Sequence, residues 1–177
     1  MRSMYPTLKQ NERLILSRVG RTAKKMPERG DIVTFEAPSK KRYFPGEANL
    51  NNPVAIYKNE PKNIFSKFAY YVLEWGKESY IKRVIGVSGD HVKIENGSVY
   101  LNGELLDEPY LQDDVQTLAL DGVFTDIIVP ENCIFAMGDN RPESLDCRSF
   151  GCIPLEKIEG KVVLRFFPFS RFGKIDK

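Results

Sequence analysis

The dipeptide Asn96-Gly97 constrains the fold most, because it separates two short runs of alternating apolar and polar residues at 92–95 and 98–101. A two-residue hairpin turn needs a positive φ at both central positions, and Asn and Gly adopt that conformation at low cost. Asn102-Gly103 follows directly and predicts another turn. The sequence therefore predicts an antiparallel hairpin here, within a fold whose strands are joined by tight turns.

Other short apolar runs between Gly, Pro and Asn turns predict further strands. These strands are expected at residues 14–16, 32–35, 80–85, 126–129, 133–137 and 161–167. Many short strands and few helices indicate a mainly β fold with antiparallel sheets. At 177 residues and 42% hydrophobic content, the chain is long enough for one domain with a substantial core.

The predicted strands divide the chain into a main domain and two additions. Residues 1–36 and 79–177 are expected to form the β domain, within which 104–131 is a small extension of the core. Residues 37–78 are rich in Pro, Asn, Lys and Gly and predict an inserted surface excursion. The apolar spacing at about 63–77 predicts a helix there. This helix either packs on the domain or touches a membrane surface, and its weakly basic polar face favours packing.

Composition excludes several classes of function. The net charge of +2 and the lack of a long Lys/Arg run argue against a nucleic-acid partner. No apolar run is long enough to span a bilayer, and no signal peptide is visible, so the sequence as written reads as soluble.

The three cysteines do not indicate a disulfide framework or a metal site. A pairing of Cys147 with Cys152 and fully reduced thiols both stay open. With His91 the cysteines would nominally supply a Cys3His set, but no Cys-x2-Cys pair is present. We therefore predict neither a metal nor another cofactor.

Ser3 and Lys82 form the most suggestive pair of reactive groups. Side chains alternate along a strand, so Lys82 shares a face with Tyr80 and Val84, and this setting suits a partly buried amine. Burial lowers the pKa of lysine, and neutral lysine can take a proton from a serine hydroxyl. Taken singly, Ser3 is equally compatible with a helix cap, and Lys82 with a lysine reaching solvent from a half-exposed strand.

His91 is the competing base, since Asp90 stands beside it. Adjacent residues on a turn point their side chains apart, which disfavours the contact that would orient the imidazole. We expect His91 to lie on the surface.

A polar loop at 137–151 follows one of the predicted strands. Asp139, Asn140 and Ser144 can bond to nearby backbone, and Asp146 can pair with Arg148. The residue order of a calcium-binding loop is absent. The loop is therefore expected to be held by its own hydrogen bonds.

Four segments in order resemble bacterial type I signal peptidases. They are Ser-Met-Tyr-Pro-Thr-Leu from Ser3, Arg-Gly-Asp-Ile-Val from Arg29, Tyr-Ile-Lys-Arg-Val-Ile-Gly-Val-Ser-Gly-Asp from Tyr80, and Gly-Asp-Asn-Arg-x-x-Ser-x-Asp-Cys-Arg-x-x-Gly from Gly138. The resemblance covers residues 3 to about 153, and the stretches 37–78 and 104–131 lie outside its motifs. It implies coiled antiparallel sheets that form a partly open barrel with a few short helices.

The resemblance also implies an activity, a partner and a location. A peptidase of this kind removes N-terminal signal peptides from exported proteins through a Ser/Lys dyad and an acyl-enzyme, after small residues in Ala-x-Ala-like sites. Its N-terminal transmembrane segment, which this sequence lacks, anchors it with the catalytic domain on the extracytoplasmic side. No cofactor and no nucleic acid are implied.

Residue roles follow from the same match. The resemblance makes Ser3 the nucleophile, Lys82 its general base, and Ser144 the serine that orients the lysine. Asp146 and Arg148 correspond to the pair that braces the loop. Residues that resemble the lining of the substrate pockets are Met4 and Ile81.

The resemblance also implies an oxyanion hole, and this sequence departs from the family pattern at two positions. The hole would use the backbone N–H of Ser3, and any helper two positions earlier falls at Met1. Cys147 stands where serine is commoner, which places a thiol near the lysine and predicts sensitivity to oxidation. Ser88 replaces a usual proline in a turn.

Three other classes of protein fit the sequence less well. A plain β binding module leaves the four motifs unexplained. A self-cleaving repressor shares the serine–lysine chemistry, but no helix-turn-helix and no Ala-Gly cleavage linker precede Ser3. A catalytically silent paralogue acting in assembly is expected to have lost Ser3, Lys82 or Asp146, and all three are present.

Overall fold

The structure is a computed structural model that describes the chain except for residues 1, 24, 58–77, 119–121 and 176–177. The helix predicted at about 63–77 lies outside the described residues, and the proposed division into a domain with an insert stays a prediction.

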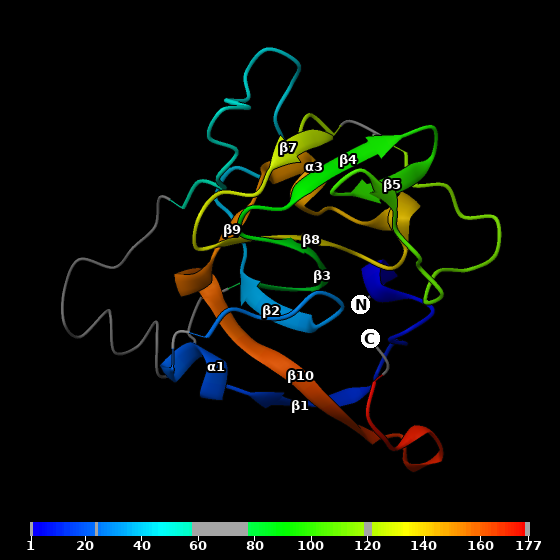
Figure 1. The fold of residues 1–177 in the computed structure, drawn as a ribbon. Helices are drawn as coiled ribbons and strands as arrows, with labels where there is room; N and C mark the ends of the chain where they lie inside the picture. The colour runs from blue at the N-terminus through cyan, green and yellow to red at the C-terminus, as the bar shows by residue number, and fades with distance from the viewer. Residues whose placement is uncertain (1, 24, 58–77, 119–121, 176–177) are drawn as a thin grey trace.

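Two antiparallel sheets form the framework of the fold (Figure 1). The six-stranded sheet has the order β1 (Arg13–Ser17), β10 (Ile158–Phe167), β2 (Ile32–Glu36), β3 (Ser79–Val87), β8 (Cys133–Met137) and β9 (Ile153–Pro154). The four-stranded sheet has the order β6 (Glu104–Leu105), β5 (Ser98–Leu101), β4 (His91–Glu95) and β7 (Asp126–Ile128).

Within the part of the chain that the structure describes, the helices are all short. They are η1 (Arg2–Met4), α1 (Val19–Thr22), η2 (Arg141–Glu143), α3 (Cys147–Phe150), η3 (Leu155–Lys157) and η4 (Phe169–Arg171). The mainly β prediction is confirmed. The sheets do not close into a barrel, since β1 and β9 are the outer strands of the larger sheet.

The predicted hairpin forms with the expected turn. Asn96 and Gly97 have φ of 52° and 80°, and the turn pairs Glu95 with Ser98. Asn102 and Gly103, with φ of 55° and 87°, form the second turn. The strand predicted at 133–137 forms β8 with the same bounds. Strand β10 begins three residues earlier than predicted, because Ile158 already pairs with Phe35 of β2.

The main core lies between the two sheets and takes side chains from both. Its buried members include Phe35, Val84, Val92, Val99, Ile127, Ile134, Phe135 and Phe150. The described part of the predicted excursion joins this core, because Tyr43 packs edge-on against Phe124 with ring centroids 5.3 Å apart. A smaller cluster under the N-terminal segment consists of Met4, Leu8, Ile32 and Val162. These two clusters fix β3 and the N-terminal segment relative to each other.

The hairpin turn provides a test of the fold. Gly97→Ala adds a Cβ at φ +80°, 3.2 Å from Gln116, so the free energy of unfolding should fall by about 1 kcal/mol. The control is Gly20→Ala in α1, where the new Cβ meets nothing closer than 3.7 Å and stability should hold or rise slightly. Urea denaturation measures both. Equal effects at the two positions would contradict the strained turn.

Candidate active site

Ser3 and Lys82 meet although 79 residues separate them in sequence. The amine of Lys82 donates hydrogen bonds to Ser3 Oγ at 2.8 Å and to the Ile81 carbonyl at 3.1 Å. Lys82 lies in β3 and is 4% exposed, and Ser3 lies in η1 and is half-buried. A hydroxyl is thus within hydrogen-bond reach of a buried amine, which is the geometry that proton transfer requires.

The environment of Lys82 favours its neutral form. Burial lowers the pKa of the amine, and the negative charge of Asp146 offsets only part of that change. Among the described residues Lys82 forms no ion pair with a carboxylate. A lysine in this setting can accept a proton at a lower pH than a solvated one.

Both faces of β3 are buried around Lys82, which the sequence did not indicate. Lys82 and Val84 point to one face as predicted, and Arg83 and Ile85 on the other face are 0% and 2% exposed. The two faces hold different partners, so the strand presents an amine to one side and a guanidinium to the other.

The N-terminal segment is tied to β3 through the loop after β8. Arg83 Nε and Nη2 donate to Asp139 at 3.0 and 2.9 Å, and both side chains are fully buried. Thr7 Oγ1 donates to the same carboxylate at 2.5 Å. Arg83 and Thr7 were not singled out from sequence. A charged residue inside an apolar strand was the signal for Arg83, because a buried charge requires a partner.

Gly138 allows the loop to approach Ser3 closely. The Asn140 N–H donates to the Ser3 carbonyl at 3.0 Å, and Asn140 Nδ2 donates to the Arg2 carbonyl at 3.2 Å. A Cβ at position 138 would lie 2.3 Å from the Ser3 carbonyl oxygen and 2.2 Å from Ser144 Oγ. Only glycine fits this contact without moving the backbone of Ser3.

The structure places Asp146 and Arg148 in direct contact. Arg148 Nε and Nη2 donate to Asp146 at 2.8 and 2.9 Å, and Asp146 also accepts from the Gly138 N–H at 3.1 Å. Burial raises the pKa of Asp146, but the Arg148 charge and hydrogen bonds outweigh it and hold the pKa below its ordinary value. Arg148 Nη2 also donates to the Arg141 carbonyl at 2.7 Å. The pair therefore links both halves of the loop.

Ser144 does not make the contact that was expected of it. The structure gives its buried Oγ no hydrogen-bond partner among the described residues, and Lys82 bonds to Ser3 and to the Ile81 carbonyl instead. The Ser144 hydroxyl lies near enough to Asp146 to contribute to lowering the pKa of that carboxyl. Its role in orienting Lys82 stays a proposal.

Met4 and Ile81 lie together beside the dyad. Met4 is fully buried in the small cluster, and the half-buried Ile81 packs against that cluster. Of the two predicted pocket residues, Ile81 is therefore the accessible one, with Met4 packed in the cluster that it covers.

The competing groups lie elsewhere or are inert. His91 Nε2 is 2.7 Å from Asp126 on the neighbouring strand β7, and Asp90 pairs with Arg29. The three cysteines are free and buried, and burial raises the pKa of Cys147 well above its usual value. A buried, protonated thiol reacts slowly with oxidants, so the structure does not support the oxidation sensitivity expected of Cys147.

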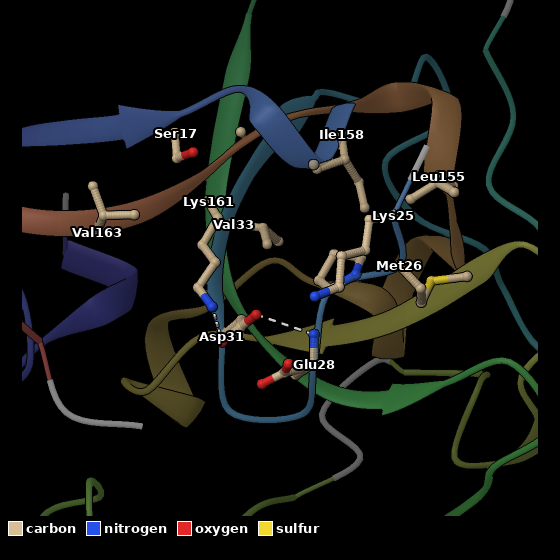
Figure 2. A pocket seen from close by; sticks show the side chains of 13 residues that line it. Ser17, Lys25, Met26, Glu28, Asp31, Val33, Leu155, Ile158, Lys161 and Val163 are labelled. Atoms are coloured by element: carbon tan, nitrogen blue, oxygen red, sulfur yellow. Dashed lines mark hydrogen bonds and ion pairs between the residues drawn. The ribbon is translucent and has the colours of Figure 1, made fainter. Parts of the chain in front are cut away.

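A hollow of about 290 Å³ lies between α1 and strands β1, β2 and β10, and it is distinct from the dyad (Figure 2). Its wall is mainly apolar, and in Figure 2 Asp31 sits between Lys161, its ion-pair partner at 2.7 Å, and the Glu28 N–H, which donates to it at 3.0 Å. None of the predicted site residues lines this hollow. We therefore assign the candidate active site to Ser3 and Lys82.

Comparisons with known proteins identify the family of this chain. A model of the family "Signal peptidase, peptidase S26" matches residues 1–167. The chain belongs to this family.

Relatives with the same description come from several bacteria. The chain is 44% identical to signal peptidase I of Bacillus caldolyticus over 107 residues, which are 55% of this chain and 58% of that protein. It is 33% identical over 171 residues to a probable signal peptidase I-2 of Synechocystis, covering 97% of this chain and 62% of that protein. Signal peptidase IB of Staphylococcus aureus is 33% identical over 183 residues, with 96% and 76% covered. The chain thus spans about three fifths of the first two relatives.

A solved structure of signal peptidase I from Enterococcus faecalis covers 77% of this chain and 97% of its own, at 24% identity and a TM-score of 0.48. Within the part of the chain that the structure describes, no helix is long and apolar enough to cross a membrane.

The buried ion pair of the site can be tested by its effect on stability. Asp139→Asn leaves Arg83 charged and without a full partner in the interior, so the free energy of unfolding should fall by about 3–5 kcal/mol. Asp126→Asn removes a carboxylate from the exposed pair with His91 and should cost about 1 kcal/mol or less. Guanidinium denaturation measures both variants. Similar small losses would show that the Arg83–Asp139 pair does not hold the segments together.

Proposed function

We propose that this chain carries the catalytic part of a type I signal peptidase, a serine endopeptidase that removes N-terminal signal peptides from exported proteins. Family membership supports the reaction class. The single observation that carries the mechanism is the 2.8 Å hydrogen bond between the buried amine of Lys82 and Ser3 Oγ.

In the proposed reaction Ser3 Oγ attacks the scissile carbonyl while neutral Lys82 accepts the hydroxyl proton. The tetrahedral intermediate collapses, the C–N bond breaks, and the ammonium of Lys82 gives its proton to the leaving amine. Water then attacks the acyl-enzyme with Lys82 as base again, and Ser3 is regenerated as the signal peptide leaves with a free carboxylate.

The Ser3 backbone N–H is the proposed donor to the developing oxyanion. The position of a further donor, two residues earlier, falls on residue 1 and outside the described residues. Asn140 supports this arrangement, because its N–H bonds to the Ser3 carbonyl in the following peptide unit, and Gly138 leaves room for the loop to come this close.

Ser144, Asp146 and Arg148 are proposed as positioning residues. The Asp146–Arg148 pair braces the loop that passes Lys82, and its carboxylate moderates the drop in the pKa of the amine. Ser144 would bond to the lysine once substrate binding shifts the amine away from the Ile81 carbonyl.

The substrate is proposed to bind as an added strand along β3. Residues 79–82 pair with β2 on one edge, whereas pairing with β8 begins only at Arg83. Among the described residues, no strand covers the other edge of 79–81. An extended peptide can form main-chain hydrogen bonds on that edge, next to Ser3.

Pocket size would then select small side chains. Ile81 packs against the cluster that contains Met4 and would form the apolar wall of a shallow pocket. This supports cleavage after small residues in Ala-x-Ala-like sites. The partners are therefore signal peptides of exported preproteins. Attachment to the cell membrane through a segment preceding this sequence, with the catalytic part outside the cytoplasm, completes the proposal.

The dyad is tested by removing each member. Ser3→Ala and Lys82→Met should each lower kcat for a peptide with an Ala-x-Ala site by at least about 10³-fold, because each removes an atom that takes part in bond making. Cleavage is followed by mass spectrometry, and circular dichroism checks that the fold persists.

The matched controls are Ser98→Ala and Lys93→Met in the hairpin, both of which should cleave at the normal rate. Retained cleavage in the Ser3 or Lys82 variant would contradict the proposal that these two residues form the catalytic dyad.

The pH dependence follows from the direction of the pKa change at Lys82. The reaction needs the neutral amine, so kcat/KM should be low at acid pH, rise with pH, and level off above the pKa of Lys82. Because burial lowers that pKa, the plateau should begin below the ordinary lysine value of about 10.4. Circular dichroism across the same pH range shows whether the low kcat/KM at acid pH comes from protonation of Lys82 or from unfolding. If kcat/KM begins to rise only around pH 10.4, the result contradicts a lysine base whose pKa is lowered by burial.

A further inference from the structure

The connection between β6 and β7 runs from the small sheet to the candidate active site (yellow-green in Figure 1). It spans residues 106–125, of which the structure describes all but 119–121. No step of the proposed reaction involves this connection. Its residues nevertheless contact Arg83, Arg141 and Arg148, three buried arginines that surround the Ser3–Lys82 site.

The first contact joins Glu108 to Arg141, which is 1% exposed. Glu108 Oε2 accepts a hydrogen bond from Arg141 Nη1 at 3.0 Å, and Glu108 Oε1 accepts another from Nη2. Arg141 Nε in turn donates to the Gly138 carbonyl at 3.2 Å. A two-bond contact of this kind fixes the plane of the guanidinium. Because Gly138 lies against the Ser3 carbonyl, Glu108 is linked through Arg141 to the backbone of Ser3.

The second contact places Tyr110 over the guanidinium of Arg83. Arg83 Cζ lies 3.9 Å from the centroid of the Tyr110 ring, and the attraction of a cation to a ring face increases when water is excluded. The Tyr110 hydroxyl donates to Glu108 Oε1 at 2.7 Å. Burial and the charge of Glu108 raise the pKa of Tyr110, so the hydroxyl stays protonated and can donate this bond. The ring therefore shields the Arg83–Asp139 pair, to which Thr7 also bonds.

The third contact involves Thr117 and the residues that follow it. Thr117 is the one buried residue among residues 107–118, and its hydroxyl accepts a hydrogen bond from Arg141 Nη1. The Leu118 carbonyl accepts from Arg148 Nη1 at 3.0 Å, and the Phe124 N–H donates to the Arg148 carbonyl at 3.1 Å. These contacts reach the arginine that pairs with Asp146 behind Lys82.

We propose that Glu108, Tyr110 and Thr117 are positioning residues for Ser3 and Lys82. Residues 108–118, which we call the arginine strap, hold the three arginines from the side of the small sheet. Arg141 then sets the place of Gly138, and Arg83 sets the place of Asp139. The two reacting groups belong to segments that these arginines join, so the strap determines how closely the hydroxyl and the amine approach.

The inference rests on the proposed peptidase function, and it predicts a specific change in kinetics. No residue of the strap pairs with residues 79–81, where the substrate is proposed to bind. Loss of a strap contact should therefore lower kcat and leave KM almost unchanged. A strap that only stabilised the fold would change the unfolding midpoint without changing kcat of the folded chain.

Glu108→Gln keeps the shape of the side chain and removes the charge that pairs with Arg141. We expect kcat for a peptide with an Ala-x-Ala site to fall by about tenfold or more, because a misplacement of about 1 Å can cost about 100-fold in rate. The matched control is Asp107→Asn, which makes the same charge change at the exposed neighbouring residue and should keep the normal kcat.

Thr117→Val gives a second test with a smaller change. It replaces the hydroxyl that accepts from Arg141 by a methyl group, and kcat should fall about threefold or more. Thr125→Val makes the same change in the same connection, at a residue that forms no hydrogen bond to an arginine among the described residues, and should have no effect. Circular dichroism confirms that each variant is folded before its rate is measured. If Glu108→Gln does not fold, Thr117→Val decides the question.

Amide hydrogen exchange tests the strap without any cleavage reaction. In Glu108→Gln or Thr117→Val the Asn140 N–H, which bonds to the Ser3 carbonyl, should exchange about tenfold faster, while the amides of β4 and β5 keep their rates. An inactive unsubstituted chain would contradict the proposed function, and the exchange result would still decide the strap. Unchanged exchange at Asn140, an unchanged kcat in both folded strap variants, or an equal fall in kcat for Asp107→Asn overturns the inference.

Discussion

The buried ion pair between Arg83 and Asp139 is the interaction on which the rest of the site depends. Arg83 follows Lys82 in β3, Asp139 opens the loop that contains Ser144, and Thr7 of the Ser3 segment donates to the same carboxylate. Neither charge can be left unpaired in the interior without a large loss of stability. The pair therefore fixes three chain segments whose relative placement decides whether Ser3 and Lys82 meet.

Buried arginines pair with the carboxylates around the site, and this leaves burial as the main influence on the pKa of Lys82. Asp139 forms an ion pair with Arg83, and Asp146 forms one with Arg148. Lys82 is left with a hydroxyl and a carbonyl as its hydrogen-bond partners, so burial dominates its pKa. The same ion pairs hold the irregular loop after β8 in one shape. They do so without a disulfide, since the described cysteines are all free. Structural support of the loop and the lowered pKa of Lys82 thus come from one set of contacts.

Sequence patterns predicted the strands well where a turn or an apolar run was local. The Asn96-Gly97 hairpin and β8 follow from residues that are neighbours in the chain. The early start of β10 at Ile158 was missed, because it depends on pairing with β2, more than 120 residues away. Burial of Arg83 and the contact between Thr7 and Asp139 were missed for the same reason. The expected bond from Ser144 to Lys82 was a family inference, and the structure gives that hydroxyl no partner among the described residues.

By itself the sequence determined that the chain forms antiparallel strands and carries a serine and a lysine in ordered motifs. Local φ preferences and side-chain alternation act over a few residues and can be read without a structure. Only the tertiary structure decided that the amine lies 2.8 Å from the hydroxyl and is desolvated. Distance, burial and local charge depend on which distant segments pack together, and no short stretch of sequence contains that information.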